Sequence, residues 1–260
     1  MITRLVGDLG HFVIAGLTYV GGAVTITGRA FSWILRGRLG GQETINQMAH
    51  VGANSIPLVM LTVGFTGAVM ALHTVLMIMQ LGAQSYIGRG AAITVLRELG
   101  PTIAAVVVAA RVGASIAAEL GSMKVTEQVD ALESLAVDPV RYLVVPRLIA
   151  CVTMMIVLTA FSYLAGIYGA YLVSVNQGVN PYSFWEGVQE KLVYSDTIKG
   201  LFKGAVFGLI IAITSCERGL GATKGARGVG NAVTSSVVLN IVQVFVVNFF
   251  LGYLLWVLMD

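Results

Sequence analysis

The amino-acid sequence predicts an all-α integral membrane protein, because of its composition and its long uncharged segments. Charged residues make up only 11% of the 260 residues and apolar residues 57%, with a mean hydropathy of +0.85. A soluble globular domain carries roughly 25% charged residues. So little charge cannot cover a soluble protein of this length, so lipid must face much of the surface.

Five segments are expected to cross the membrane, since roughly 20 apolar residues span the hydrocarbon core. Three contain no charged residue: Ile56–Met79, Leu148–Val175 and Val233–Leu258. Two others are interrupted by charge. One runs over about 91–118 and contains Arg97, Glu98 and Arg111, and the other runs over about 198–216 and contains Lys199 and Lys203.

The distribution of Lys and Arg predicts the orientation. The N-terminal segment and the loops 119–147 and 217–231 hold ten: Arg4, Arg29, Arg36, Arg38, Lys124, Arg141, Arg147, Arg218, Lys224 and Arg227. The opposite side holds only Arg89 and Lys191. Because basic loops stay in the cytoplasm, the N-terminus is expected there and the C-terminus on the periplasmic side.

Residues 1–45 are expected to lie outside the five-span permease domain, which covers 46–260. This segment is apolar, but six glycines between Gly7 and Gly28 lower its helix propensity, and a sixth span would place Arg4 outside. We therefore expect one or two helices in the cytoplasmic membrane interface, with Arg29, Arg36 and Arg38 near anionic headgroups.

Small residues recur every fourth position in two of the spans. The two series are Ala109, Gly113, Ala117 and Gly121, and Gly200, Gly204 and Gly208. Such series allow close approach of helix backbones in lipid. They predict packing faces.

The sequence offers nothing for catalysis or for a cofactor. It contains no G-x-x-x-x-G-K-[ST] motif, so no phosphate-binding P-loop for ATP is expected. The three histidines are scattered, and neither they nor the two cysteines have a metal-ligand spacing. We expect no catalytic residue, no metal and no cofactor.

The loop after the second span contains a short amphipathic pattern. Val129, Leu132 and either Leu135 or Ala136 recur at helical spacing, while the acidic residues Glu127, Asp130 and Glu133 fall on another face. Such a helix can seal the bundle, or its acids can bind a protein partner, since anionic lipid repels them. The residues alone leave both interpretations open.

Three stretches of sequence resemble the MlaE family, the permeases of ABC transporters that work with MCE-domain lipid-binding proteins. They are Leu96-Arg-Glu-Leu-Gly-Pro101, the run from Ala118 to Leu132 (AELGSMKVTEQVDAL), and Ala136-Val-Asp-Pro139. The resemblance extends from about residue 45 to the C-terminus. The middle stretch is long and specific.

The resemblance implies a homodimer in the bacterial inner membrane, with separate ATPase subunits on the cytoplasmic side and an MCE protein outside. It implies that the chain moves phospholipid to or from that MCE carrier and maintains outer-membrane lipid asymmetry, while ATP is hydrolysed on the partner. The segment of about 119–138 would be the coupling helix. Its expected contact residues are Glu119, Glu127, Asp130 and Glu133.

Arg97 and Glu98 are the charged pair most relevant to a lipid site. Adjacent helical residues point in different directions, so the two need separate partners. They either cap the span among headgroups or line a cavity, since intramembrane charges tend to face the bundle interior. The resemblance favours a phospholipid cavity near this level, between the two subunits. Lys199 and Lys203 either snorkel outward or contribute to a headgroup site. Leu72, Leu76 and Met77 are expected to contact the acyl chains.

A self-sufficient secondary transporter or channel is the alternative function. Such proteins are often built from two repeats with broken helices at the membrane midplane. Five spans do not divide into equal halves and the sequence shows no internal repeat. A purely structural membrane scaffold is a third interpretation that composition allows.

Overall fold

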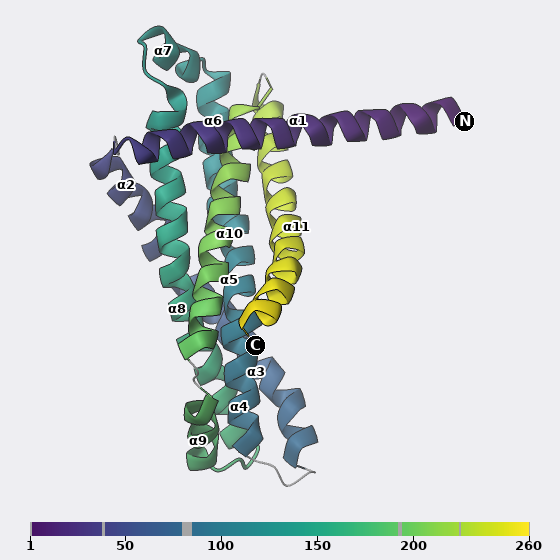
Figure 1. Ribbon diagram of the computed structural model, residues 1–260, viewed down its shortest axis with the longest axis vertical. Coiled ribbons are helices and arrows are strands. Elements are labelled where there is room, and N and C mark those ends of the chain that lie inside the picture. The colour runs from purple at the N-terminus through teal and green to yellow at the C-terminus, as the bar shows by residue number, and fades with distance from the viewer. Residues whose placement is uncertain (1, 38–39, 80–84, 192–193, 224, 260) are drawn as a thin grey trace.

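The computed structural model describes residues 2–37, 40–79, 85–191, 194–223 and 225–259. Within these ranges all regular secondary structure is helical (Figure 1). Arg38, Lys224 and Asp260 lie outside the described residues, as do the side chains of Arg4 and Lys191. Their expected places on one side or the other stay predictions.

Five helical segments of the described chain are long and apolar enough to cross a membrane, which confirms the expected number. They are Gly41–Met79, Tyr86–Val125, Val140–Asn176, Ser195–Leu220 and Ala226–Leu255. Each expected span falls on one of them. Each segment begins before the expected span, because polar residues continue the helix at that end.

The helices follow one another with several π-helical turns inside the spans. The first span comprises α2 (Gly41–Met48), η1 (Ala49–Ala53) and α3 (Ile56–Met79). The second comprises α4 (Ser85–Thr94), η2 (Val95–Leu99), α5 (Gly100–Val108), η3 (Ala109–Gly113) and α6 (Ala114–Val125). The rest of the chain forms α7 (Gln128–Ser134), η4 (Val140–Val144), α8 (Val145–Asn176), α9 (Pro181–Lys191), α10 (Tyr194–Leu220) and α11 (Ala226–Met259).

The N-terminal segment forms one long helix, α1 (Ile2–Leu35), that crosses the bundle instead of joining it. In Figure 1 it runs across the other helices near α7, whereas α4 and α9 lie at the opposite end. We call these the α7 end and the α9 end. The glycines of α1 lower its helix propensity but do not interrupt it. Its location in the membrane interface stays a prediction.

Helix α8 lies at the centre of the packing, with α3 on one side and α10 on the other. Its contact with α3 brings backbone against backbone, since a side chain at Gly67 would overlap the Gly166 carbonyl and one at Gly169 would overlap the Gly64 carbonyl. Large buried side chains such as Leu158 and Phe207 fill the adjoining core.

The predicted glycine series on α10 is a packing face. A side chain at Gly200 would overlap the Tyr163 hydroxyl, one at Gly204 the Thr159 hydroxyl, and one at Gly208 would press on the Cys151 carbonyl at 2.6 Å. All three contacts are on α8. The absence of side chains therefore brings α10 close to α8 along more than two turns.

Candidate functional site

A π-helical turn, η2, places the two predicted charges Arg97 and Glu98 on the second span. The turn is followed by Pro101, whose ring nitrogen has no hydrogen to donate to the carbonyl of Arg97. That carbonyl instead accepts a hydrogen bond from the Lys203 ammonium at 3.1 Å. Proline thus frees a backbone acceptor inside the bundle, and α10 supplies its donor.

Arg97 and Glu98 each form an ion pair with α10. Arg97 Nε lies 2.7 Å from Asp196 Oδ1, and Lys203 Nζ lies 2.7 Å from Glu98 Oε1. Asp196 and Lys203 are seven positions apart, about two helical turns, so they lie on the same face of α10. The structure therefore brings the predicted residues Arg97, Glu98 and Lys203 into one cluster.

Burial within this cluster is unequal. The α10 partners are enclosed, with 3% of each side chain exposed for Asp196 and Lys203, whereas Arg97 is 33% and Glu98 47% exposed. Lys199, between them on α10, is also buried. The buried Asp196 and Lys203 hold η2 in place. The more exposed Arg97 and Glu98 present a cation and an anion to the surroundings of the bundle.

Two members of the cluster were not predicted from the sequence. Asp196 was assigned no role, and Asn248 of α11 donates from Nδ2 to Glu98 Oε2 at 2.9 Å. A side chain added at Gly252 would lie 3.6 Å from both Glu98 and Lys203, so this glycine also borders the cluster. Asn248 is a lone polar residue in an apolar run, a signal that could have identified it.

The residues predicted to contact acyl chains, Leu72, Leu76 and Met77, are all exposed on α3. Their role as lipid contacts stays a prediction.

The expected coupling segment is not a single helix over 119–138. α6 continues to Val125, Glu127 adopts a left-handed conformation with φ of 60°, and the separate α7 covers only Gln128–Ser134. Val129 lies on the buried face of α7, as expected. Leu135, which the pattern allowed on the buried face, is instead largely exposed just after the helix.

The four acidic residues predicted to contact an ATPase are all exposed, but they lie in two places and have different partners. Glu127, Asp130 and Glu133 are exposed at α7, where Asp130 pairs with Lys124 at 2.7 Å. Glu119 belongs to α6 and pairs at 2.7 Å with Arg147, which is buried and also donates to the Leu143 carbonyl. Glu119 therefore ties α6 to the start of the third span and lies apart from the exposed α7 acids.

Helix α1 is attached to the end of this loop through Asp138. The carboxylate accepts hydrogen bonds from Arg29 Nη2, Trp33 Nε1 and the Val140 amide, each at 2.9 Å. Burial raises the pKa of Asp138, but these hydrogen bonds and the Arg29 charge outweigh it and hold the pKa below the usual 3.8. The contact links α1 to the segment that leaves α7.

Residues 44–254 match the family described as Permease MlaE, which is more than half of the chain. The chain belongs to the MlaE permease family. It is a multi-pass membrane protein, and five helical segments of its described residues are long and apolar enough to cross a membrane. The matched range contains the Arg97 cluster and α7, whereas α1 lies before it.

Relatives of this MlaE family chain come from bacteria and a plant. The "Probable ABC transporter permease protein slr1045" of Synechocystis is 42% identical over 235 residues, covering 90% of this chain and 89% of the relative. A "Probable ABC transporter permease protein" of Rickettsia felis is 39% identical over 250 residues and 96% of each chain. The chloroplastic "Protein TRIGALACTOSYLDIACYLGLYCEROL 1" of Arabidopsis thaliana is 35% identical over 87% of this chain and 65% of its own length.

Proposed function

We propose that this chain is the membrane subunit of an ABC transporter that moves phospholipid between the inner membrane and an MCE-domain carrier, and so maintains outer-membrane lipid asymmetry. Relatives named as probable ABC transporter permeases support the transporter class over a self-sufficient channel. ATP is hydrolysed on a separate subunit. The α7 end faces the cytoplasm and the C-terminus faces the periplasm, in keeping with the positions of Lys and Arg.

The observation that carries the lipid assignment is the cluster of paired charges on η2 and α10. Charged side chains inside a membrane span are costly unless they are paired or functional. Here two buried charges of α10 hold the partly exposed Arg97 and Glu98 in one cluster, where each has its own ion-pair partner. A guanidinium and a carboxylate in one cluster complement the phosphate and amine of a zwitterionic headgroup.

A second copy of the chain is proposed to cover the faces that the single chain leaves exposed. On α11 the exposed apolar residues include Val242, Phe245, Phe249 and Tyr253. Only 11% of an apolar 18-residue stretch of this span is buried. Asn248 and Gly252 on the same helix border Glu98. A dimer formed along α3 and α11 would enclose the headgroup cluster together with Leu72, Leu76 and Met77.

The test of this function is ATP-dependent transfer of a fluorescent phospholipid. Proteoliposomes containing the full chain and its ATPase partner are mixed with the MCE carrier, and transfer is followed by loss of quenching. We expect transfer only with hydrolysable ATP. Transfer of equal rate without the ATPase subunit would establish a self-sufficient transporter and overturn the proposal.

The α7 acids provide a test of the ATPase contact. Reversing Glu127, Asp130 and Glu133 to Lys removes three exposed negative charges, so we expect a large loss of ATPase co-purification because complementary charge governs such contacts. The matched control is Glu186→Lys, an exposed acid on α9 at the other end. Full ATPase retention in the triple variant would show that α7 does not bind this partner.

A further inference from the structure

Two adjacent cavities open between α1, α10 and α11 at the α7 end. One has a volume of about 540 Å³ and the other about 530 Å³, and Tyr19 of α1 lines both. Glu217 in the first cavity is 14 positions beyond Lys203 on α10, about 21 Å along the helix axis. The first cavity therefore lies well away from the Arg97 cluster, and no member of that cluster lines the second.

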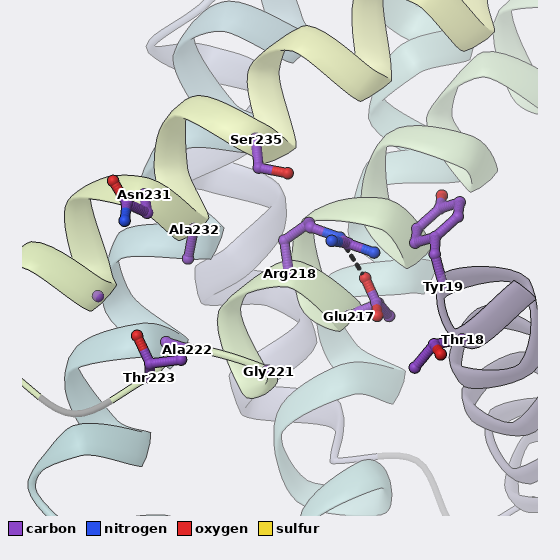
Figure 2. A pocket seen from close by; sticks show the side chains of 11 residues that line it. Thr18, Tyr19, Glu217, Arg218, Gly221, Ala222, Thr223, Asn231, Ala232 and Ser235 are labelled. Atoms are coloured by element: carbon purple, nitrogen blue, oxygen red, sulfur yellow. Dashed lines mark hydrogen bonds and ion pairs between the residues drawn. The ribbon is translucent and has the colours of Figure 1, made fainter. Parts of the chain in front are cut away.

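The first cavity is the more polar of the two and contains one acid and one base. Arg218 Nε donates to Glu217 Oε2 at 2.6 Å, and the guanidinium carbon lies 4.5 Å from the centre of the Tyr19 ring (Figure 2). Both charged side chains are partly buried, with 26% of Arg218 and 15% of Glu217 exposed. The Nη groups of Arg218 and Oε1 of Glu217 form no hydrogen bond to the described residues, and Thr18, Asn231 and Ser235 add neutral polar groups.

The second cavity continues from the first along α1 and is lined mainly by apolar residues. Its walls include Val24, Ile213 and Val247. Tyr19 lines both, and its hydroxyl is held by the Thr214 hydroxyl and by Gln243 Nε2, both at 2.7 Å. The more polar cavity therefore adjoins the apolar groove at the Tyr19 ring.

We propose that these two cavities bind one phospholipid with an amine-bearing zwitterionic headgroup. The phosphate would bind the free Nη groups of Arg218, the ammonium would bind Oε1 of Glu217, and an acyl chain would occupy the groove beside Val24 and Ile213. An anionic headgroup would place its charge against Glu217. A trimethylated amine would have no N–H to donate to that carboxylate. Binding at this site does not require that the chain transports phospholipid.

Two glycines of α1 allow the groove to be blocked with a matched control. A side chain at Gly28, which lines the groove, would meet no atom within 4 Å, and the same holds for Gly21, which lines neither cavity. Gly28→Leu therefore adds a side chain at the groove from a position where its Cβ has room, while Gly21→Leu makes the same change of residue elsewhere on α1. Displacing about two methylenes of an acyl chain corresponds to about tenfold in affinity.

The experiment uses the full chain in phosphatidylcholine nanodiscs containing a phosphatidylethanolamine probe with a photoreactive acyl chain. We expect crosslinks on the groove residues of α1 and α10, about tenfold fewer in Gly28→Leu, and wild-type yield in Gly21→Leu. Equal yields in the two variants would overturn the proposal. Crosslinks to a second copy of the chain in place of lipid would also overturn it, by assigning the groove to a subunit interface.

The headgroup is tested in the same nanodiscs with a phosphatidylglycerol probe. The wild-type chain should give more crosslinks with the phosphatidylethanolamine probe than with the phosphatidylglycerol probe. Glu217→Gln should reverse that order, because the positive charge of Arg218 then has no carboxylate beside it at residue 217. Unchanged preference in Glu217→Gln would refute the headgroup assignment. Millimolar glycerophosphoethanolamine should not displace the probe, and complete displacement would identify a soluble phosphoester as the occupant. Both readouts stand whether or not the chain transports phospholipid.

Discussion

Two Arg–Asp ion pairs, one on the spans and one at the α7 end, have similar geometry and different surroundings. Arg97 reaches Asp196 at 2.7 Å and Arg29 reaches Asp138 at 2.9 Å. Only 3% of the Asp196 side chain is exposed, against 23% of Asp138, and Arg29 is itself 52% exposed. Water can replace a lost partner of Asp138 but cannot easily reach Asp196.

The difference shows that distance alone does not measure how much a pair matters. Breaking a buried pair by removing one partner leaves an uncompensated charge, whereas an exposed pair contributes little beyond solvent contacts. The span cluster therefore fixes the positions of η2 and α10. The Arg29–Asp138 pair guides the position of α1 but adds little to the stability of the fold.

The largest effect is expected from Arg97→Ala. It leaves buried Asp196 without this cation, so unfolding should become easier by about 3–5 kcal/mol. Asp196→Asn removes the charge that needs a partner and should cost clearly less. Unfolding of the full chain in detergent, followed by circular dichroism, measures both. A smaller loss for Arg97→Ala than for Asp196→Asn would contradict the interpretation.

An intermediate effect is expected from Gly200→Ala, which lies on α10 between Asp196 and Lys203. The added methyl would overlap the Tyr163 hydroxyl and the Leu96 carbonyl, forcing α10 away from η2 and lengthening both ion pairs. We expect a loss of about 1–3 kcal/mol, typical of an overpacked core. The control is Gly230→Ala on α11, where the methyl enters open space and should be neutral or slightly stabilising.

Arg29→Ala should have a smaller effect, about 0.2–1 kcal/mol, because the pair is exposed. High salt should reduce the difference between this variant and wild type further. The measurement is the thermal midpoint at low and at high ionic strength. A loss as large as that of Arg97→Ala would show that exposure does not distinguish the two pairs.

The smallest effect is a dependence on pH through Asp138. Because the folded-state pKa lies below 3.8, this carboxyl stabilises the fold above pH 3.8, and the contribution disappears as pH falls through the folded-state pKa. Asp138→Asn should therefore be less stable than wild type at neutral pH and approach it in acid. A constant difference across that range would exclude the linkage.

The number and order of the spans followed from the uncharged runs, since a membrane leaves few other ways to place 20 apolar residues. The partners of Arg97 and Glu98 did not. Asp196 is about 100 positions from Arg97 in sequence, and only the packing of α10 against α8 and η2 brings the two together. The spacing of residues along the chain does not reveal such long-range pairs.

The loop after the second span shows the same limit on a smaller scale. Its pattern correctly predicted a short helix with Val129 on the buried face and with Glu127, Asp130 and Glu133 exposed. Glu119 differs, because its partner Arg147 is 28 positions away on the next span. The left-handed Glu127, which separates α6 from α7, had no glycine or proline to signal it.

The glycine contacts between α3 and α8 limit the routes by which a lipid tail can enter. Where Gly67 meets Gly166 and Gly169 meets Gly64, the two main chains touch and no side chain can rotate aside to open a passage. A hydrocarbon chain can rest in the surface groove beside Phe65 but cannot pass between these helices. A lipid that reaches the Arg97 cluster from the side must therefore enter elsewhere than between α3 and α8.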